Sequence, residues 1–241
     1  DNSLRYLGEK KTAGENMARS KLNLAGRQLE LVKGISEVNR NVIIIYINGK
    51  PIAEPWISQN IDAIIEAWEP GSMGGKAIGE IIFGDVNPSG KLPLTFPRSV
   101  GQLQMIYNHK PTQYFRKYAD EEITPLHCFG YGLSYSEFEY SNLNLDYRKG
   151  GDSNVKVSFL LSNKSDFDGE EVVQVYFRDC YSSVTRPVKE LVEYKRVFIK
   201  AHQSKNISLS IDIEKLAFYD INMNLCVEKG DFVFMIGGSS D

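Results

Sequence analysis

Two glutamates with the chemistry of a proton donor lie near the start of the chain. Glu9 and Glu15 each follow a glycine in the stretch Leu7–Arg19, which comes after a predicted strand at Leu4–Leu7 and before a predicted helix. Ligands of open α/β sheets bind at this place, just past the carboxyl end of a strand. A carboxylic acid on such a loop can protonate a leaving group. Glutamates in loops are mostly solvated, so the residues alone leave both interpretations open.

Other residue types with catalytic or metal-binding chemistry form no known motif. The run Gly74-Gly75-Lys76 lacks the Walker spacing, and Ser134 does not fit the Gly-x-Ser-x-Gly nucleophile elbow. His109 is a possible base without a partner near it in sequence. The three cysteines form no Cys-x-x-Cys pair and are interpreted as buried thiols. The three histidines are far apart as well, so the sequence predicts no metal site.

The elements that would position these residues differ between the two parts of the chain. Up to about Phe138, strand-like and helix-like stretches alternate with short connections, which is typical of an α/β layer fold. Asn41–Asn48 shows no polar alternation, as expected of a parallel strand covered on both faces. The neighbouring helices and the second strand are predicted at Gln28–Val38, Trp56–Ile61, Ala63–Trp68 and Gly74–Phe83.

Two irregular stretches follow these elements. Asp85–Arg98 concentrates proline and glycine, so we expect an ordered loop that leads into a short edge strand. Between Gly101 and Leu133 periodicity is weak but aromatic residues are dense, from Tyr107 to Tyr131. Such a stretch either stacks on sugar faces or packs one domain on the next, and the residues leave both alternatives open.

From Glu139 onward, short segments of period-two alternation are separated by Gly, Asn, Asp or Ser turns. Such a series of strands predicts an antiparallel β-sandwich. The strand candidates are Val155–Ser162, Val172–Phe177, Val192–Ile199, Ile207–Ile211 and Phe232–Ile236. We therefore predict two domains, an α/β domain over residues 1–137 and a β-sandwich over residues 138–241.

Composition excludes several classes of function. A hydrophobic fraction of 42% with 24% charged residues is that of a soluble globular protein. The net charge of −3 argues against a nucleic-acid partner. The longest apolar run, Val42–Ile47, is too short to cross a membrane. The chain opens at Asp1 without a methionine, so we expect an upstream part.

A series of specific runs in a fixed order carries a family resemblance. The first part contains Ala63-Ile-Ile-Glu-Ala-Trp-Glu-Pro-Gly71, then Asn-Pro-Ser-Gly-Lys-Leu-Pro within Phe83–Pro97, then Phe129-Gly-Tyr-Gly-Leu-Ser-Tyr135. These runs resemble glycoside hydrolase family 3, the β-glucosidase and β-xylosidase family. Gly169–Tyr176 and Arg186–Leu191 resemble the fibronectin type III-like module of that family. The resemblance covers essentially the whole chain.

The resemblance implies a fold and a set of site residues. It implies part of an α/β/α sandwich with a mostly parallel sheet, then a fibronectin type III-like, immunoglobulin-like β-sandwich. Members of the family are retaining exo-enzymes with an Asp nucleophile on an N-terminal barrel and a Glu acid/base on a loop of the α/β sandwich. Gly14–Arg19 and Leu24–Gln28 match that loop. The match implies that Glu15 is the general acid/base and that Arg19 contacts substrate. No metal or organic cofactor is implied.

The resemblance also implies the partners of this chain. They are a β-linked oligosaccharide or glycoside, such as a glucoside or a xyloside, and the N-terminal barrel of the same enzyme. The barrel and the first part of the α/β sandwich are expected to be absent from this chain, so the chain alone is expected to be inactive. Relatives often act outside the cytoplasm, which favours a periplasmic or secreted location. The alternative is a non-catalytic carbohydrate-binding or scaffolding fragment. A barrel-sized stretch of sequence upstream of Asp1 would decide between the two in favour of the enzyme.

Overall fold

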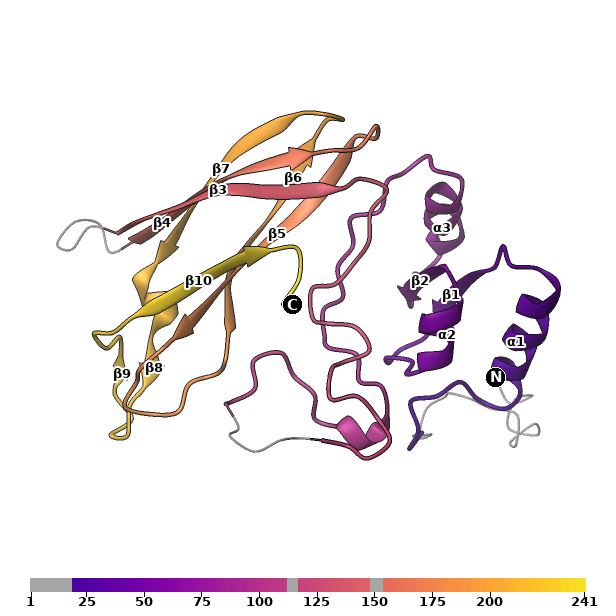
Figure 1. Ribbon diagram of the computed structural model, residues 1–241, viewed down its shortest axis with the longest axis horizontal. Coiled ribbons are helices and arrows are strands. Elements are labelled where there is room, and N and C mark those ends of the chain that lie inside the picture. The colour runs from indigo at the N-terminus through magenta and orange to yellow at the C-terminus, as the bar shows by residue number, and fades with distance from the viewer. Residues whose placement is uncertain (1–18, 112–116, 148–153) are drawn as a thin grey trace. The chain divides into compact units, whose positions relative to one another are not determined.

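A computed structural model describes residues 19–111, 117–147 and 154–241. The described chain divides into two compact units. The first comprises residues up to 78 together with 96–104 and 121–126, and the second comprises 79–95, 105–120 and residues from 127 onward. The boundary between residues 78 and 79 falls within helix α3 (Gly74–Ile82), and Figure 1 labels the helices and strands.

The first unit is an α/β arrangement around a parallel strand pair. Helix α1 (Gln28–Val38), strand β1 (Ile43–Ile47), helix α2 (Pro55–Asn60) and strand β2 (Ala63–Trp68) follow one another, and β1 pairs with β2 in parallel. Helix α3 (Gly74–Ile82) comes next. The β-branched run of β1 favours a strand, and a proline suits the first turn of α2 because that position needs no intrahelical N–H donor. The predicted alternation of strands and helices is confirmed.

The apolar faces of α1 and β1 are open to solvent in the described chain. Ile43, Ile45 and Ile47 are 45%, 39% and 67% exposed. Within the described residues, α1 has no buried side chain, although its apolar residues follow helical spacing. The sequence predicted a strand covered on both faces, and that cover is not supplied by the described residues.

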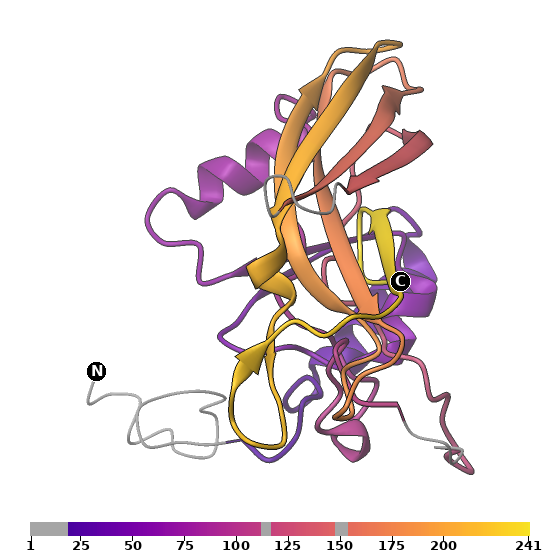
Figure 2. The ribbon, with the colours of Figure 1, turned by 90° about the vertical axis from the view of Figure 1, so that its left-hand side faces the viewer.

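The second unit contains a β-sandwich, which begins at Phe138. One sheet has the order β10-β5-β6, the other β3-β4-β7, and β8 pairs with β9 in a small hairpin at one end (Figures 1 and 2). The strands are β3 (Phe138–Tyr147), β4 (Asn154–Asn163), β5 (Gly169–Asp179), β6 (Glu190–Ile199), β7 (Ser204–Asp212), β8 (Phe218–Tyr219), β9 (Leu225–Cys226) and β10 (Phe232–Gly237). Both sheets contribute to one apolar core, which includes Val157 and Leu161 of β4 and Val173 and Val175 of β5. The predicted fold class, α/β followed by a β-sandwich, is confirmed.

Three local expectations have a different outcome. The edge strand expected after the loop at Asp85–Arg98 does not form in the described chain, where Phe96 is an isolated bridge followed by a 3-10 turn at Val100–Gln102. Pro93 and Pro97 flank this position and lack the N–H donors that a ladder needs. The strand expected at Leu4–Leu7 lies outside the described residues. Cys128, Cys180 and Cys226, which were expected to be buried, are only partly buried residues.

The aromatic stretch contributes packing within the second unit. The rings of Tyr107 and Phe129 stack with centroids 4.3 Å apart, and Tyr107 meets Tyr176 of β5 edge to face at 5.7 Å. Tyr176 is 2% exposed and its hydroxyl donates to Gln174 Oε1. These contacts favour the packing interpretation for Tyr107 and Phe129 over sugar stacking.

A buried arginine joins the strands of the sandwich. The side chain of Arg186 is 7% exposed and pairs with Glu190 at 2.7 Å and with Asp179 at 3.8 Å. Its guanidinium carbon lies 4.5 Å from the ring centroid of Phe218 and 5.6 Å from that of Phe177. The two carboxylates and the two aromatic rings together compensate for the loss of hydration of the cation.

Replacing Arg186 with methionine is therefore expected to destabilise the chain by about 3–5 kcal/mol, because Asp179 would keep a buried charge without its cation. Burial already raises the pKa of Asp179. A raised native pKa means that the native state holds the proton more tightly, so the stability of the variant should rise as pH falls through that pKa. Urea unfolding at several pH values measures both effects.

Two further variants control this experiment. Arg186→Met combined with Asp179→Asn should recover much of the lost stability, because no buried charge is left unpaired. Lys164→Met removes one partner of an exposed ion pair with Glu139, whose side chains are 53% and 56% exposed, and should change stability by no more than about 0.5 kcal/mol. Equal losses for Lys164→Met and Arg186→Met would contradict the role assigned to the buried cation.

Candidate active site

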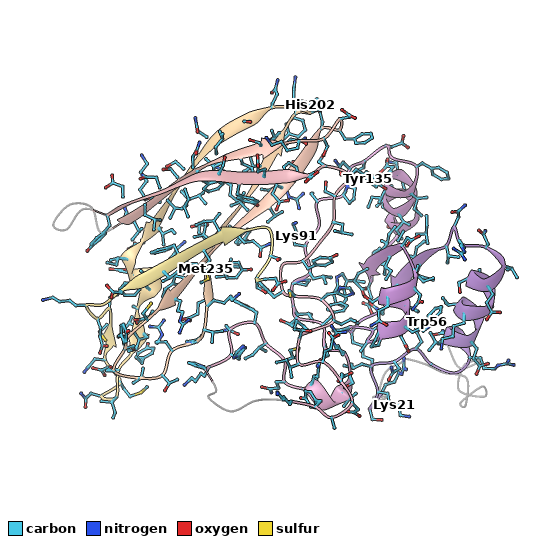
Figure 3. All side chains as sticks on the ribbon, in the orientation of Figure 1. Lys21, Trp56, Lys91, Tyr135, His202 and Met235 are labelled. Carbon is cyan, nitrogen blue, oxygen red and sulfur yellow. The ribbon has the colours of Figure 1, made fainter. Side chains whose placement is uncertain are left out.

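The predicted acid/base, Glu15, lies outside the described residues, as does Glu9. The structure does describe the segment that follows the predicted loop, residues 19–24 of the first unit. Lys21 lies in this segment (Figure 3). Residues 19–24 therefore show how the chain is held directly after the loop.

Arg19 is the predicted site residue that the structure describes. Its Nη2 donates to the backbone oxygen of Asn23 at 2.5 Å, which folds the side chain back along its own segment. Arg19 also lines an open hollow of about 700 Å³. The other lining residues are Ser20, Lys21, Asn23, Leu24, Ala25, Gly26, Leu29, Glu30 and Glu54. Both polar and apolar residues line the hollow, and several of them directly follow the predicted loop in sequence.

Backbone and amide hydrogen bonds tie residues 19–24 to the connection between β1 and α2. The Ala53 amide donates to the Leu22 oxygen at 3.0 Å. The Asn23 side-chain amide donates to the Ala53 oxygen at 2.9 Å. Gly26 then turns the chain into α1 with φ +57°, a conformation that L side chains rarely adopt.

Two charged side chains strengthen this attachment. Lys50 Nζ donates to the Lys21 oxygen at 2.7 Å and to the Arg19 oxygen at 3.5 Å. Glu54, which is 5% exposed, accepts from the Leu24 amide at 2.8 Å. Burial, and then the nearby charge of Arg19, lowers the pKa of Lys50. Sequence reasoning did not single out Lys50 or Glu54, since the contacts that reveal them are about 30 residues apart along the chain.

A second polar group lies at the carboxyl ends of β1 and β2. Asn48 Nδ2 donates to Glu66 Oε2 at 3.4 Å, and the Trp68 amide donates to Glu66 Oε1 at 3.3 Å. Burial raises the pKa of Glu66, and burial with the carboxylates of Glu54 and Glu66 raises that of Tyr46. Trp68 has φ +51°, a strained value for an aromatic residue. The signal that could have found Glu66 is its place at the end of a parallel strand.

The model for the family described as "Glycosyl hydrolase family 3 C-terminal domain" matches residues 1–135, more than half of the chain. The model for the family described as "Fibronectin type III-like domain" matches residues 171–240. The chain belongs to glycoside hydrolase family 3.

Family 3 relatives match the chain along nearly all of its length. It is 37% identical to the periplasmic beta-glucosidase of Salmonella typhimurium and 39% identical to a beta-xylosidase of Formosa agariphila, in each case over 95% of the chain. Among solved structures, a β-glucosidase from Erythrobacter marinus matches 96% of the chain with TM-score 0.88 and 37% identity. A beta-glucosidase from Listeria innocua in complex with glucose matches 95% with TM-score 0.88 and 32% identity.

The chain spans about a third of the length of these family 3 relatives: 31% and 32% of the two enzymes above, and 31% and 33% of the two structures. It corresponds to their C-terminal part.

Asn87, which lies in the run Phe83–Pro97 that resembles family 3, has a structural role in the second unit. Asn87 Oδ1 accepts from the Ser134 hydroxyl and the Tyr135 amide at 2.8 and 2.9 Å. Its Nδ2 donates to the Ser136 hydroxyl and the Asp168 oxygen at 2.8 and 2.9 Å. The Ser134 hydroxyl is thus engaged in a hydrogen bond within this group. Tyr135 is labelled in Figure 3.

No group of three or more His, Cys, Asp or Glu side chains could hold a metal ion among residues 19–111, 117–147 and 154–241. Over the same ranges, no helix has the length and apolar character needed to cross a membrane.

Proposed function

We propose that this chain supplies the general acid/base of a retaining, exo-acting β-glycosidase, a β-glucosidase or a β-xylosidase. The observation that carries the proposal is the family 3 match over residues 1–135, which includes the Gly14–Arg19 loop and Glu15. Relatives named as β-glucosidases and β-xylosidases support the substrate class.

In this proposal two carboxyl groups divide the reaction. Glu15 protonates the glycosidic oxygen while an aspartate on an upstream barrel attacks the anomeric carbon. Glu15 then removes a proton from the water that hydrolyses the glycosyl-enzyme, with the two carboxyl groups about 5–5.5 Å apart. Arg19 contacts the substrate, and the reaction uses no metal or organic cofactor.

The open apolar faces of the first unit support an upstream partner in the same enzyme. The exposed isoleucines of β1 and the exposed Leu31 and Val38 of α1 form surface that a folded α/β domain would bury. We propose that the upstream part of the enzyme covers it. We also propose that the family 3 α/β domain occupies residues 1–137 and the fibronectin type III-like domain residues 138–241.

The test uses the full-length enzyme, meaning this chain joined to the upstream part that completes the length of its relatives. Glu15→Gln should make the rate depend strongly on the acidity of the leaving group, whereas Glu9→Gln should not. The measurement is kcat/KM over a series of aryl β-glycosides. A series in which Glu15→Gln behaves like the parent enzyme would reject the assignment.

A further inference from the structure

The segment after the predicted acid/base loop is held by side chains from a separate stretch of chain. Lys50 and Glu54 both lie in the connection between β1 and α2, and they reach residues 19–24 at opposite ends. Lys50 Nζ donates to the backbone oxygens of Lys21 and Arg19 at 2.7 and 3.5 Å. Glu54 Oε1 accepts from the Leu24 amide at 2.8 Å.

The bonding of Glu54 shows that this attachment is specific. Glu54 stands at the N-cap position of α2, yet its side chain makes no cap hydrogen bond there. Its carboxylate accepts from the Leu24 amide instead, and the residue is 5% exposed. A hydrogen bond between a charged group and the backbone is stronger than one between neutral groups. A buried carboxylate with such a bond therefore fixes the position of Leu24 more firmly than a solvated loop contact would.

Lys50 acts in a similar way on the other end of the segment. Its ammonium bonds two backbone oxygens that are two residues apart, so it restrains the path of the chain between Arg19 and Lys21. The Arg19 side chain closes back on the Asn23 oxygen at 2.5 Å. Between them, these bonds leave residues 19–24 little freedom to shift relative to β1 and α2.

We propose that Lys50 and Glu54 are positioning residues for the acid/base loop. The inference rests on the proposed function, because it matters for catalysis only if Glu15 is the acid/base. The Arg19 oxygen that Lys50 binds is four residues downstream of Glu15. A shift of about 1 Å in a catalytic group can slow a reaction about 10²-fold, so the end of the loop must be fixed.

The test measures leaving-group dependence in the full-length enzyme. Glu54→Ala removes the acceptor for Leu24, whereas Glu54→Gln keeps a side-chain oxygen in its place. Glu54→Ala should slow the hydrolysis of substrates with poor leaving groups by roughly 10–100-fold. The hydrolysis of activated aryl glycosides should slow much less, because their leaving groups do not need proton donation. Glu54→Gln should stay close to the parent enzyme.

Lys50 gives an independent series. Lys50→Met should show the same dependence on the leaving group as Glu54→Ala, and Lys50→Arg, which keeps a cationic donor, should fall between Lys50→Met and the parent. Lys33→Met is the matched control in the same unit. Lys33 Nζ lies 5.0 Å from the ring centroid of Trp56, a residue that Figure 3 labels. In the described part of the chain, the Lys33 side chain makes no hydrogen bond to residues 19–24.

The outcomes separate this inference from the proposed function. Equal losses for good and poor leaving groups, or the same dependence in Lys33→Met, would overturn the positioning role. Glu15→Gln is measured beside these variants. If it shows leaving-group dependence and the Glu54 and Lys50 variants do not, only the positioning role fails. If Glu15→Gln shows none, the proposed function fails first. A thermal melt of each variant identifies any that does not fold. At such a position the conservative variant, Glu54→Gln or Lys50→Arg, is compared with the parent enzyme instead.

Discussion

The purified 241-residue chain is expected to hydrolyse aryl β-glucosides and β-xylosides no faster than the buffer does. A retaining mechanism needs a nucleophile as well as an acid/base, and the proposed nucleophile belongs to the upstream part. The chain spans about a third of its relatives' length. Joined to the upstream part, it should turn over the same substrates, and a release assay for the aryl alcohol measures both samples.

The control for this experiment is the full-length enzyme carrying Glu15→Gln, which keeps the proposed upstream nucleophile. A chain that turns over substrate by itself at a rate near that of the full-length enzyme would contradict the proposed division of catalytic groups. A full-length protein that folds but remains inactive would favour the non-catalytic, carbohydrate-binding alternative.

Removing the Glu15 carboxyl in the full-length enzyme has the second large expected effect. General acid–base assistance is worth roughly 10²–10⁴-fold, so Glu15→Gln should lose about that factor for substrates with poor leaving groups. Activated aryl glycosides should lose much less in the first step, because their leaving groups depart without protonation. The slope of log kcat/KM against leaving-group pKa measures the difference.

Glu9 provides the matched control for Glu15. It follows a glycine in the same stretch of sequence, six residues upstream, and carries the same functional group. Glu9→Gln should keep the shallow slope of the parent enzyme. A steep slope in Glu9→Gln with a normal slope in Glu15→Gln would move the acid/base to Glu9.

Apolar periodicity predicted most of the fold. Helix α1 and strand β2 have the predicted bounds, Gln28–Val38 and Ala63–Trp68. Strand β3 was not among the strand candidates. It is largely exposed, and its pairing with β4 shifts register between Ser141 and Asn144, where Asn142 has φ +55°. Polar and apolar residues do alternate along Phe138–Tyr147, but the apolar residues change from even to odd positions at this irregularity. No single period-two pattern therefore spans the whole strand.

The candidate site was predictable only in part. Glu15 and Arg19 came from the family resemblance, because a loop glutamate alone is more often solvated. Lys50 and Glu54 were not predictable, since their importance depends on contacts with residues about 30 positions away. The exposed face of β1 could not be foreseen either. The run of apolar residues predicts that the strand is covered but not which part of the enzyme covers it.

The most direct test of the central claim is the product that the Glu15→Ala enzyme forms with azide. Azide needs no deprotonation and can use the space left by the carboxyl, so it should restore turnover of an activated aryl β-glycoside. In the proposed mechanism the upstream nucleophile forms an α-linked glycosyl-enzyme, and azide attacks the β face of its anomeric carbon. The predicted product is therefore the β-glycosyl azide, identified by NMR. Absence of azide rescue in Glu15→Ala, or formation of the α-glycosyl azide, would contradict the assignment of Glu15 as the acid/base of a retaining enzyme.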